Sequence, residues 1–311
     1  MSSANLTIPE GQQLLSDAEL QELNKPKRSG KELAGGIASL FGIAFIILYC
    51  LLPFLWMIIS SLRRPADGLS NAYLPDPASV QNYKIVFGEQ NNFLVSLGNS
   101  VVIAVVTTAL TLLFGIVAAY ALARLRFVGK MVVLSIIIGC SMFPAITMLV
   151  PLMKMFTGVS YDWFPWSWMN TYRAVIIPSL SFGLPLCVWN LTAFFRQLPV
   201  ELEHAAMVDG CTPQEAFRKV ILPLAAPGIF TTVILTFIAV WNEYMFAYTF
   251  LTDKAKMTAP VALSQFTGST SFNIPYGAIM AAGVVVTVPL LIMVLIFQRR
   301  IVAGLTAGGV K

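Results

Sequence analysis

Few side chains in this 311-residue sequence could carry chemistry, because 57% of the residues are hydrophobic and only 11% are charged. His204 is the only histidine, so a metal site of several histidines cannot be built, and we expect no Ser-His catalytic arrangement. The sequence contains no G-x-x-x-x-G-K-[ST] loop, which excludes ATP binding of that kind. We therefore expect no catalytic residue, no metal and no cofactor on this chain.

Glu243 is the one acidic residue deep in an apolar segment, where a carboxylate is costly and faces protein or a water-filled cavity. Its neighbours Trp241, Asn242 and Tyr244, together with Asn190, supply amide, hydroxyl and aromatic groups. Such groups match the hydroxyls and apolar ring faces of a sugar. Three interpretations stay open: Glu243 lines a sugar pathway, locks its helix to a neighbour through hydrogen bonds, or relays protons.

The polar stretch ELEHAAMVDGCTPQEAFRKVILP, at 201–223, is the second candidate site, because it interrupts an otherwise apolar sequence. Pro199 suits a first helical turn, and Glu201 and Glu203 suit the positive end of a helix. Gly210 can adopt the left-handed conformation that caps a helix. We expect a first short helix between Pro199 and Gly210.

A second short helix is expected directly after the first. Thr212 to Glu215 has the capping-box pattern, with Pro213 at the first helical position. The helix should run to about Leu222 and stop at Pro223. A plain connector needs only a few residues, so two capped helices favour a built surface, although a polar link stays open as the alternative.

The elements that position these residues are six apolar segments. Each has the roughly 20 residues that a helix needs to cross a bilayer. The predicted fold class is therefore all-α and integral to the membrane, with a polar tail at 1–33, a six-helix domain at 34–298 and a tail at 299–311. The predicted spans are 34–62, 97–123, 131–153, 174–195, 228–251 and 276–298.

Lys and Arg orient these spans, because cytoplasmic segments carry an excess of both. With the N-terminus inside, thirteen of the twenty basic residues lie on the cytoplasmic side, although Arg63 and Arg64 fall outside. Both termini and the loop at 197–227 are then cytoplasmic. The net charge of +5 reflects this asymmetry, so we expect membrane lipids and no nucleic acid as partners.

The 201–223 stretch also carries a family resemblance. Ala205-Ala206, Gly210 and Val220 to Pro223 resemble the E-A-A-x3-G-x9-I-x-L-P signature of permease subunits in ATP-binding cassette (ABC) importers. The wider sequence resembles the MalG-like member of the maltose-type carbohydrate permeases, which implies the type I ABC importer permease fold in a bacterial or archaeal plasma (inner) membrane. Four stretches carry that likeness: AAYALARLRFVGK (118–130), WNEY (241–244), TAPVALSQF (258–266) and QRRIVAGLTAGGVK (298–311).

The resemblance implies partners and roles for particular residues. In that family the signature forms a coupling helix that docks in a cleft of the ATP-hydrolysing subunit, so ATP and Mg are bound by two partner subunits. A second, MalF-like permease subunit and an extracytoplasmic solute-binding protein are also implied. The coupling residues are Glu201, Glu203, His204, Ala205, Ala206, Asp209, Gly210 and Pro223. The loop implied to meet the binding protein includes Ser264, Gln265, Phe266, Thr267 and Gly268.

One departure from the family pattern concerns the coupling stretch. His204 stands where the family has Glu directly before Ala-Ala, and Glu203 lies one residue earlier, about 100° round the helix. The ion pair made by that family Glu is therefore replaced or rewired in this chain.

The function that the sequence favours is the permease subunit of an ATP-driven, binding-protein-dependent importer of an oligosaccharide, such as a maltose- or trehalose-like sugar. The chain itself is then not an enzyme. The alternatives are an importer of a glycerophospho-compound or another polyol, a proton-coupled secondary transporter that uses Glu243, and a membrane scaffold that transports nothing.

Overall fold

The computed structural model describes residues 30–68, 72–89, 91, 93–158, 167–266 and 274–307. It divides into two units, residues 1–55 and 56–311. The described part of the first unit belongs to helix α2 (Gly30–Ser61), which begins before the predicted position 34 and ends in the second unit. Every regular element in the described ranges is helical, as predicted.

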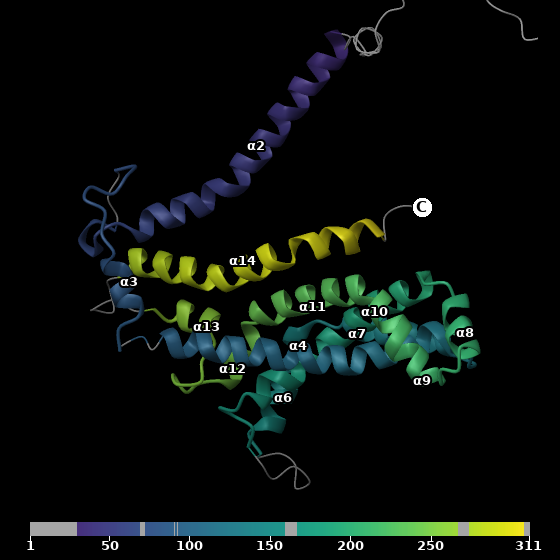
Figure 1. Cartoon of the computed structure of the whole chain (residues 1–311). Coiled ribbons are helices and arrows are strands. Elements are labelled where there is room, and N and C mark those ends of the chain that lie inside the picture. Colours follow the sequence, from purple (N-terminus) through teal and green to yellow (C-terminus); the bar gives the residue numbers. More distant parts are fainter. Residues whose placement is uncertain are drawn as a thin grey trace, which may run out of the picture. The chain divides into compact units, whose positions relative to one another are not determined.

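The second unit contains the remaining helices (Figure 1). Its long helices are α4 (Phe93–Arg124), α7 (Arg173–Gln197), α11 (Ala226–Trp241) and α14 (Tyr276–Ala307). The shorter helices are α3 (Gln81–Val86), α5 (Lys130–Ser141), α6 (Leu149–Phe156), α8 (Glu201–Val208), α9 (Pro213–Ala216), α10 (Leu222–Leu224), α12 (Met245–Phe250) and α13 (Ala259–Ser264). Two 3-10 turns, η1 (Pro65–Asp67) and η2 (Ala145–Met148), and a π-helix, η3 (Phe217–Ile221), complete the described elements.

The described helices give between four and six candidate spans, so the predicted count of six stays a prediction. Four described helices are long and apolar enough to cross a membrane, and up to six spans result if each of two bent helix pairs counts as one. The predicted span 131–153 is one of these pairs, α5 and α6, which meet at 83° around Pro144. The predicted span 228–251 is also interrupted, because α11 ends at Trp241 and α12 begins at Met245.

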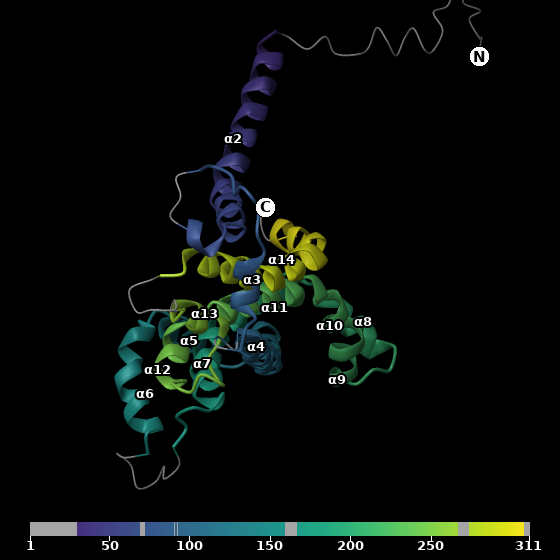
Figure 2. The same ribbon diagram turned by 90° about the vertical axis from the view of Figure 1, so that its left-hand side faces the viewer.

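Helices α4, α7 and α11 form the core of the second unit, and they pack closely because small residues lie between them (Figures 1 and 2). A Cβ atom on Gly115 of α4 would lie 2.4 Å from Cys187 Sγ of α7. A Cβ on Gly228 of α11 would lie 2.4 Å from Cγ of Phe194. A side chain at either glycine would therefore require Cys187 or Phe194 to move.

Arg63, which opposes the predicted orientation, has a local packing role. The residue is 4% exposed, its guanidinium carbon lies 5.2 Å from the ring centroid of Trp56, and its side chain donates to the Ala72 carbonyl. The amide of Asn82 in turn donates to the Arg63 carbonyl at 2.7 Å. These contacts explain a basic residue at this position without any role in orienting the chain.

Candidate functional site

The two predicted short helices are present in the 201–224 segment, which lies at one end of the α4, α7 and α11 bundle (Figure 1). Helix α8 has Glu201 and Glu203 in its first turn, as expected from the helix dipole. Gly210 follows its C-terminus with φ = 92°, the left-handed conformation that the sequence predicted. Pro199 lies just before α8 rather than in its first turn.

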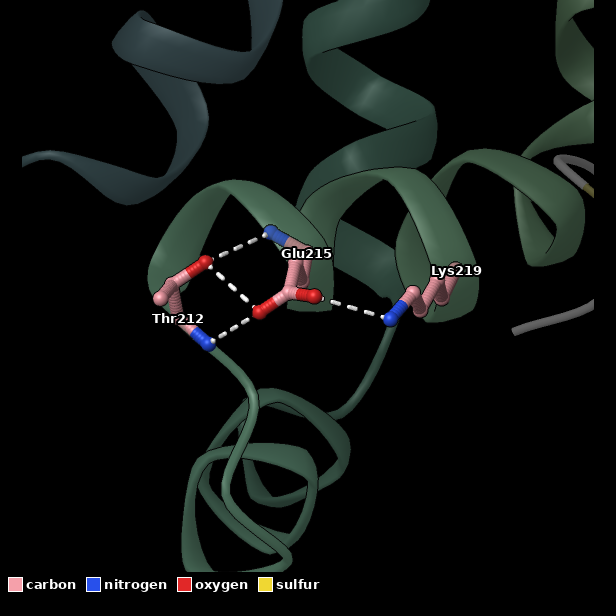
Figure 3. A network of polar contacts seen from close by, with 3 residues as sticks. All are labelled: Thr212, Glu215 and Lys219. Carbon is pink, nitrogen blue, oxygen red and sulfur yellow. Dashed lines mark hydrogen bonds and ion pairs between the residues drawn. The ribbon is translucent and has the colours of Figure 1, made fainter.

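The capping box that begins the second short helix is formed as predicted (Figure 3). Glu215 N–H donates to Thr212 Oγ1 at 3.3 Å, and Thr212 N–H donates to Glu215 Oε2 at 3.0 Å. Lys219 Nζ donates to Glu215 Oε1 at 2.9 Å. The bond from Lys219, together with the bonds from Thr212, lowers the pKa of Glu215 to about 2.

The end of the second helix differs from the prediction, because Pro223 does not stop it. The π-helix η3 leads directly into α10, which continues through Pro223 to Leu224. Proline lacks the N–H that an α-helix needs at this position, and the wider π turn immediately before it changes the hydrogen-bond ladder there. The helical path then turns by 70° into α11.

Glu203 points into the protein rather than into solvent. Its Oε1 forms an ion pair with Nε of Arg124 at 3.0 Å, and the two side chains are only 12% and 7% exposed. Arg124, the last residue of α4, also donates from Nη2 to the Leu198 carbonyl at 2.8 Å. This buried pair fastens α8 to the end of α4, so among the predicted coupling residues Glu203 is one that contacts the helix bundle.

An aromatic cluster fastens the second short helix to the bundle. The ring centroids of Tyr120 on α4 and Phe217 on η3 lie 4.4 Å apart. Tyr120 also meets Phe195 of α7 edge-on at 5.9 Å. Ile221 is fully buried in the same apolar cluster. The 201–224 segment is thus packed against both α4 and α7 and continues into α11.

The opposite face of α8 is exposed and partly apolar. Ala206 is buried, whereas Ala205 is exposed. Leu202 and Val208 lie three residues to either side of Ala205, and Val208 is 87% exposed. Residues at this spacing share one helix face. The sequence reasoning missed Leu202 and Val208, although their spacing was a readable signal. Exposed polar members of the predicted set are Glu201, His204 and Asp209.

Glu243 lies in the break between α11 and α12. Its Oε1 accepts the Phe246 N–H at 2.7 Å, and its Oε2 accepts the Ala247 N–H at 3.0 Å. The carboxylate therefore satisfies the free N–H groups at the start of α12. The sequence-based interpretation has Glu243 bonded to a neighbouring helix, whereas these bonds join α11 to α12 within one predicted span.

The other residues of the predicted sugar pathway do not gather around Glu243. Trp241 is 1% exposed and stacks on Phe237 in the core. Asn242 donates to the Ile238 carbonyl of its own helix, and Tyr244 Oη lies 3.2 Å from Ser264 Oγ. Asn190 is half-buried on α7. Glu243 lines a cavity of about 290 Å³, but the other four residues do not.

The segment predicted to meet a binding protein is described only in part, since Thr267 and Gly268 lie outside the described residues. Ser264 ends α13 and Gln265 is exposed. Phe266 is buried, and its ring lies 5.5 Å from that of Phe93. Phe266 therefore anchors the start of this segment instead of extending from it.

Asn99 holds the chain that leads into the same segment, a role that no pattern in the sequence indicates. Its Nδ2 donates to the carbonyls of Ala255 and Met257 at 3.0 and 2.9 Å, and its Oδ1 accepts from Tyr172 Oη at 2.7 Å. Ser100 Oγ accepts the Ala259 N–H at 2.8 Å. The bonds to Ala255, Met257 and Ala259 join α4 to chain more than 150 residues away, a pairing that no local pattern encodes.

Comparisons with known proteins give this arrangement a context. Residues 111–306 match the model of the family described as "Binding-protein-dependent transport system inner membrane component". The chain is 42% identical over 266 residues to the trehalose transport system permease protein SugB of Mycobacterium tuberculosis (86% of this chain, 94% of the relative). It is 38% identical to the trehalose/maltose transport system permease protein MalG of Thermococcus litoralis (90% and 99%).

Two further comparisons widen the range of substrates among relatives and confirm the fold. The sulfoquinovosyl glycerol transport system permease protein SmoH of Agrobacterium fabrum is 39% identical, over 91% of this chain and 95% of the relative. A bacterial ABC transporter involved in import of the acidic polysaccharide alginate has a chain that superposes with a TM-score of 0.72 at 21% identity, covering 88% of this chain and 99% of that one. This structural match bears on the fold alone.

Proposed function

The chain belongs to the family of binding-protein-dependent transport system inner membrane components, and we infer that it is the transmembrane permease subunit of an ATP-driven sugar importer. It is a multi-pass inner-membrane transport component. ATP hydrolysis is assigned to partner chains, because the sequence contains no P-loop motif.

The observation that carries this function is the 201–224 segment, which has one face bound to the bundle and the other face exposed. The exposed face presents Ala205 between Leu202 and Val208, with His204 beside them. Small and apolar side chains let a second protein approach an α-helix closely. We assign this face to docking in a cleft of an ATP-binding subunit, as the family signature implies.

The buried face of the segment supplies the connection to the membrane helices. Arg124 links α8 to α4 through Glu203, and Tyr120 links η3 to α4 and α7. Because α10 leads into α11, a displacement of the docked segment acts on three helices of the core. Closure of the ATP-binding subunits would then shift the equilibrium between inward-facing and outward-facing states.

The remaining partners follow from the same assignment. Two ATP-binding subunits hold ATP and Mg, a MalF-like second permease subunit completes the pathway, and an extracytoplasmic solute-binding protein delivers the sugar. The segment after Ser264 is assigned to contact with that binding protein. Both termini and the 201–224 segment then lie in the cytoplasm, as the distribution of Lys and Arg predicts.

The proposed substrate is an oligosaccharide such as a maltose- or trehalose-like sugar, in keeping with the relatives that carry those names. A glycerophospho-compound or another polyol is the alternative within the class. A proton-coupled transporter is the alternative from another class. It would be driven by the proton gradient, whereas the proposed importer is driven by ATP hydrolysis.

Reconstitution of the chain with its partner subunits and binding protein in vesicles tests the function. Uptake of labelled trehalose or maltose should require both ATP and the binding protein. A catalytically inactive ATP-binding subunit provides the matched control and should abolish uptake. Uptake that survives this control and collapses with the proton gradient would contradict the proposal.

A further inference from the structure

The cavity beside Glu243 lies where two broken membrane segments meet a continuous helix. Ala145 lines it from the break between α5 and α6, and Glu243 lines it from the break between α11 and α12. Ser179 and Phe182 line it from α7, and Thr236 lines it from α11. Irregular backbone within a membrane is tolerated where it borders a cavity, and discontinuous helices frame the substrate sites of many transporters.

The polar groups of this cavity are available to a ligand. Ser179 is only 6% exposed, yet its Oγ has no hydrogen-bond partner among the described residues, an arrangement that leaves a buried hydroxyl unsatisfied. Each Glu243 oxygen accepts one backbone N–H. A carboxylate has about four acceptor positions, so acceptor capacity remains for a hydroxyl group of a ligand.

Aromatic rings supply the other part of the site. The rings of Phe182 and Phe246 are stacked, with centroids 5.9 Å apart and an interplanar angle of 30°. Both line the cavity, whose other lining residues are mainly aliphatic. Largely apolar walls with a few placed polar groups are typical of small-molecule sites, and the volume of about 290 Å³ is close to the lower end of their range.

The charge of the lining selects among ligands. Glu243 contributes an acidic group, and no Lys or Arg occurs among the cavity's lining residues. A carboxylate at low dielectric repels sulfonate, phosphate and uronate groups, whereas it accepts hydrogen bonds from neutral hydroxyls. The site therefore disfavours the glycerophospho alternative.

We propose that this cavity binds one ring of a neutral sugar during transport, with Ser179 and Glu243 bonded to its hydroxyls and Phe182 and Phe246 against its apolar face. The proposal rests on the sugar-import function and adds to it a substrate contact on this subunit and a preference for uncharged sugars.

Uptake by the assembled complex tests the proposal with labelled trehalose, maltose and sulfoquinovosyl glycerol as neutral and anionic probes. Rates are measured at sugar concentrations that saturate the binding protein, so that its affinity does not set the rate. Ser179→Ala removes only the hydroxyl, and we expect it to lower neutral-sugar uptake about five-fold, the loss expected for one hydrogen bond. Ala239→Phe, which adds a ring in the cavity wall, should lower uptake further.

Val288→Phe is the matched control, because it adds the same ring at an exposed position of α14 outside the cavity. Its uptake should equal that of the wild type. Uptake unchanged in both Ser179→Ala and Ala239→Phe would overturn the cavity as a sugar site while leaving the importer function intact. Wild-type uptake of sulfoquinovosyl glycerol alone would overturn the preference for neutral sugars. If none of the three probes is taken up, the proposed function fails as well.

Discussion

The 201–224 segment and the Glu243 break are both polar interruptions of an apolar chain, but their geometry is determined in different ways. The first is built from local rules: Gly210 caps one helix and the Thr212 to Glu215 box starts the next. At the second, Glu243 also bonds to nearby backbone, but its cavity is formed with α7 and with the break near Pro144. Local sequence thus specifies the surface segment, whereas tertiary packing defines the membrane site.

The largest effect is expected at the turn of the surface segment. Gly210 has φ = 92°, and proline is restricted to about −65°, so Gly210→Pro cannot keep this turn. We expect ATP hydrolysis stimulated by the binding protein to fall to its basal level. Gly210→Asn is the matched variant, because asparagine tolerates the left-handed region, and it should retain most of the stimulation. Full stimulation in Gly210→Pro would remove the turn from the mechanism.

The buried Arg124 and Glu203 pair provides the next largest effect. Arg124→Met leaves the Glu203 carboxylate buried without a partner, which should cost about 3 kcal/mol of stability. The double variant Arg124→Met with Glu203→Leu removes both charges and should recover much of this loss. Thermal inactivation of the purified complex measures the loss of stability in Arg124→Met and in the double variant. If the double variant loses as much stability as Arg124→Met and Glu203→Leu lose separately, added together, the two charges are not coupled.

A smaller effect on stability is expected at the break between α11 and α12, where Glu243 accepts backbone hydrogen bonds. Glu243→Ala removes two acceptors for backbone N–H groups and should cost roughly 2 kcal/mol. Glu243→Gln keeps one acceptor oxygen and should lose about half as much. Amide hydrogen exchange at Phe246 and Ala247 reports this local opening directly. Equal protection in wild type and Glu243→Ala would show that the carboxylate does not hold α12.

The smallest effect concerns the capping box, whose carboxylate is at the surface. The pKa of Glu215 lies at about 2, below its ordinary value of 4.5, so its stabilising contribution is complete above about pH 4.5 and is lost as the pH falls through about 2. An NMR titration of the Glu215 side chain should place the midpoint near 2. A midpoint near 4.5 would contradict the bonds from Lys219 and Thr212. Glu215→Gln preserves the capping-box pattern and should change transport little.

These regions also show how far the sequence predicts the structure. Apolar runs identified the all-helical fold, and caps identified α8 and α9, because both depend on residues close in the chain. The break near Pro144 falls inside the predicted span 131–153, whereas Pro178, Pro185 and Pro289 lie within continuous helices. Whether a proline breaks a membrane helix depends on the groups packed around it.

The candidate sites were predicted unevenly for the same reason. Sequence proximity grouped Trp241 with Glu243, but Trp241 points into the core and Ser179, from another helix, lies in the cavity wall. Glu203 was grouped with His204 because the two are adjacent in sequence. Its neighbour in space is Arg124, which lies 79 residues earlier in the chain (203 − 124). Such pairings depend on how the helices cross, which composition and spacing do not specify.

Photocrosslinking from the exposed face of α8 tests the central claim most directly. A benzoylphenylalanine at Val208, which is 87% exposed, should form an adduct with an ATP-binding subunit in the assembled complex. The same group at Val133, on the exposed side of α5, should form none. No adduct with an ATP-binding subunit from Val208, in a complex that still transports sugar, would contradict docking of this segment.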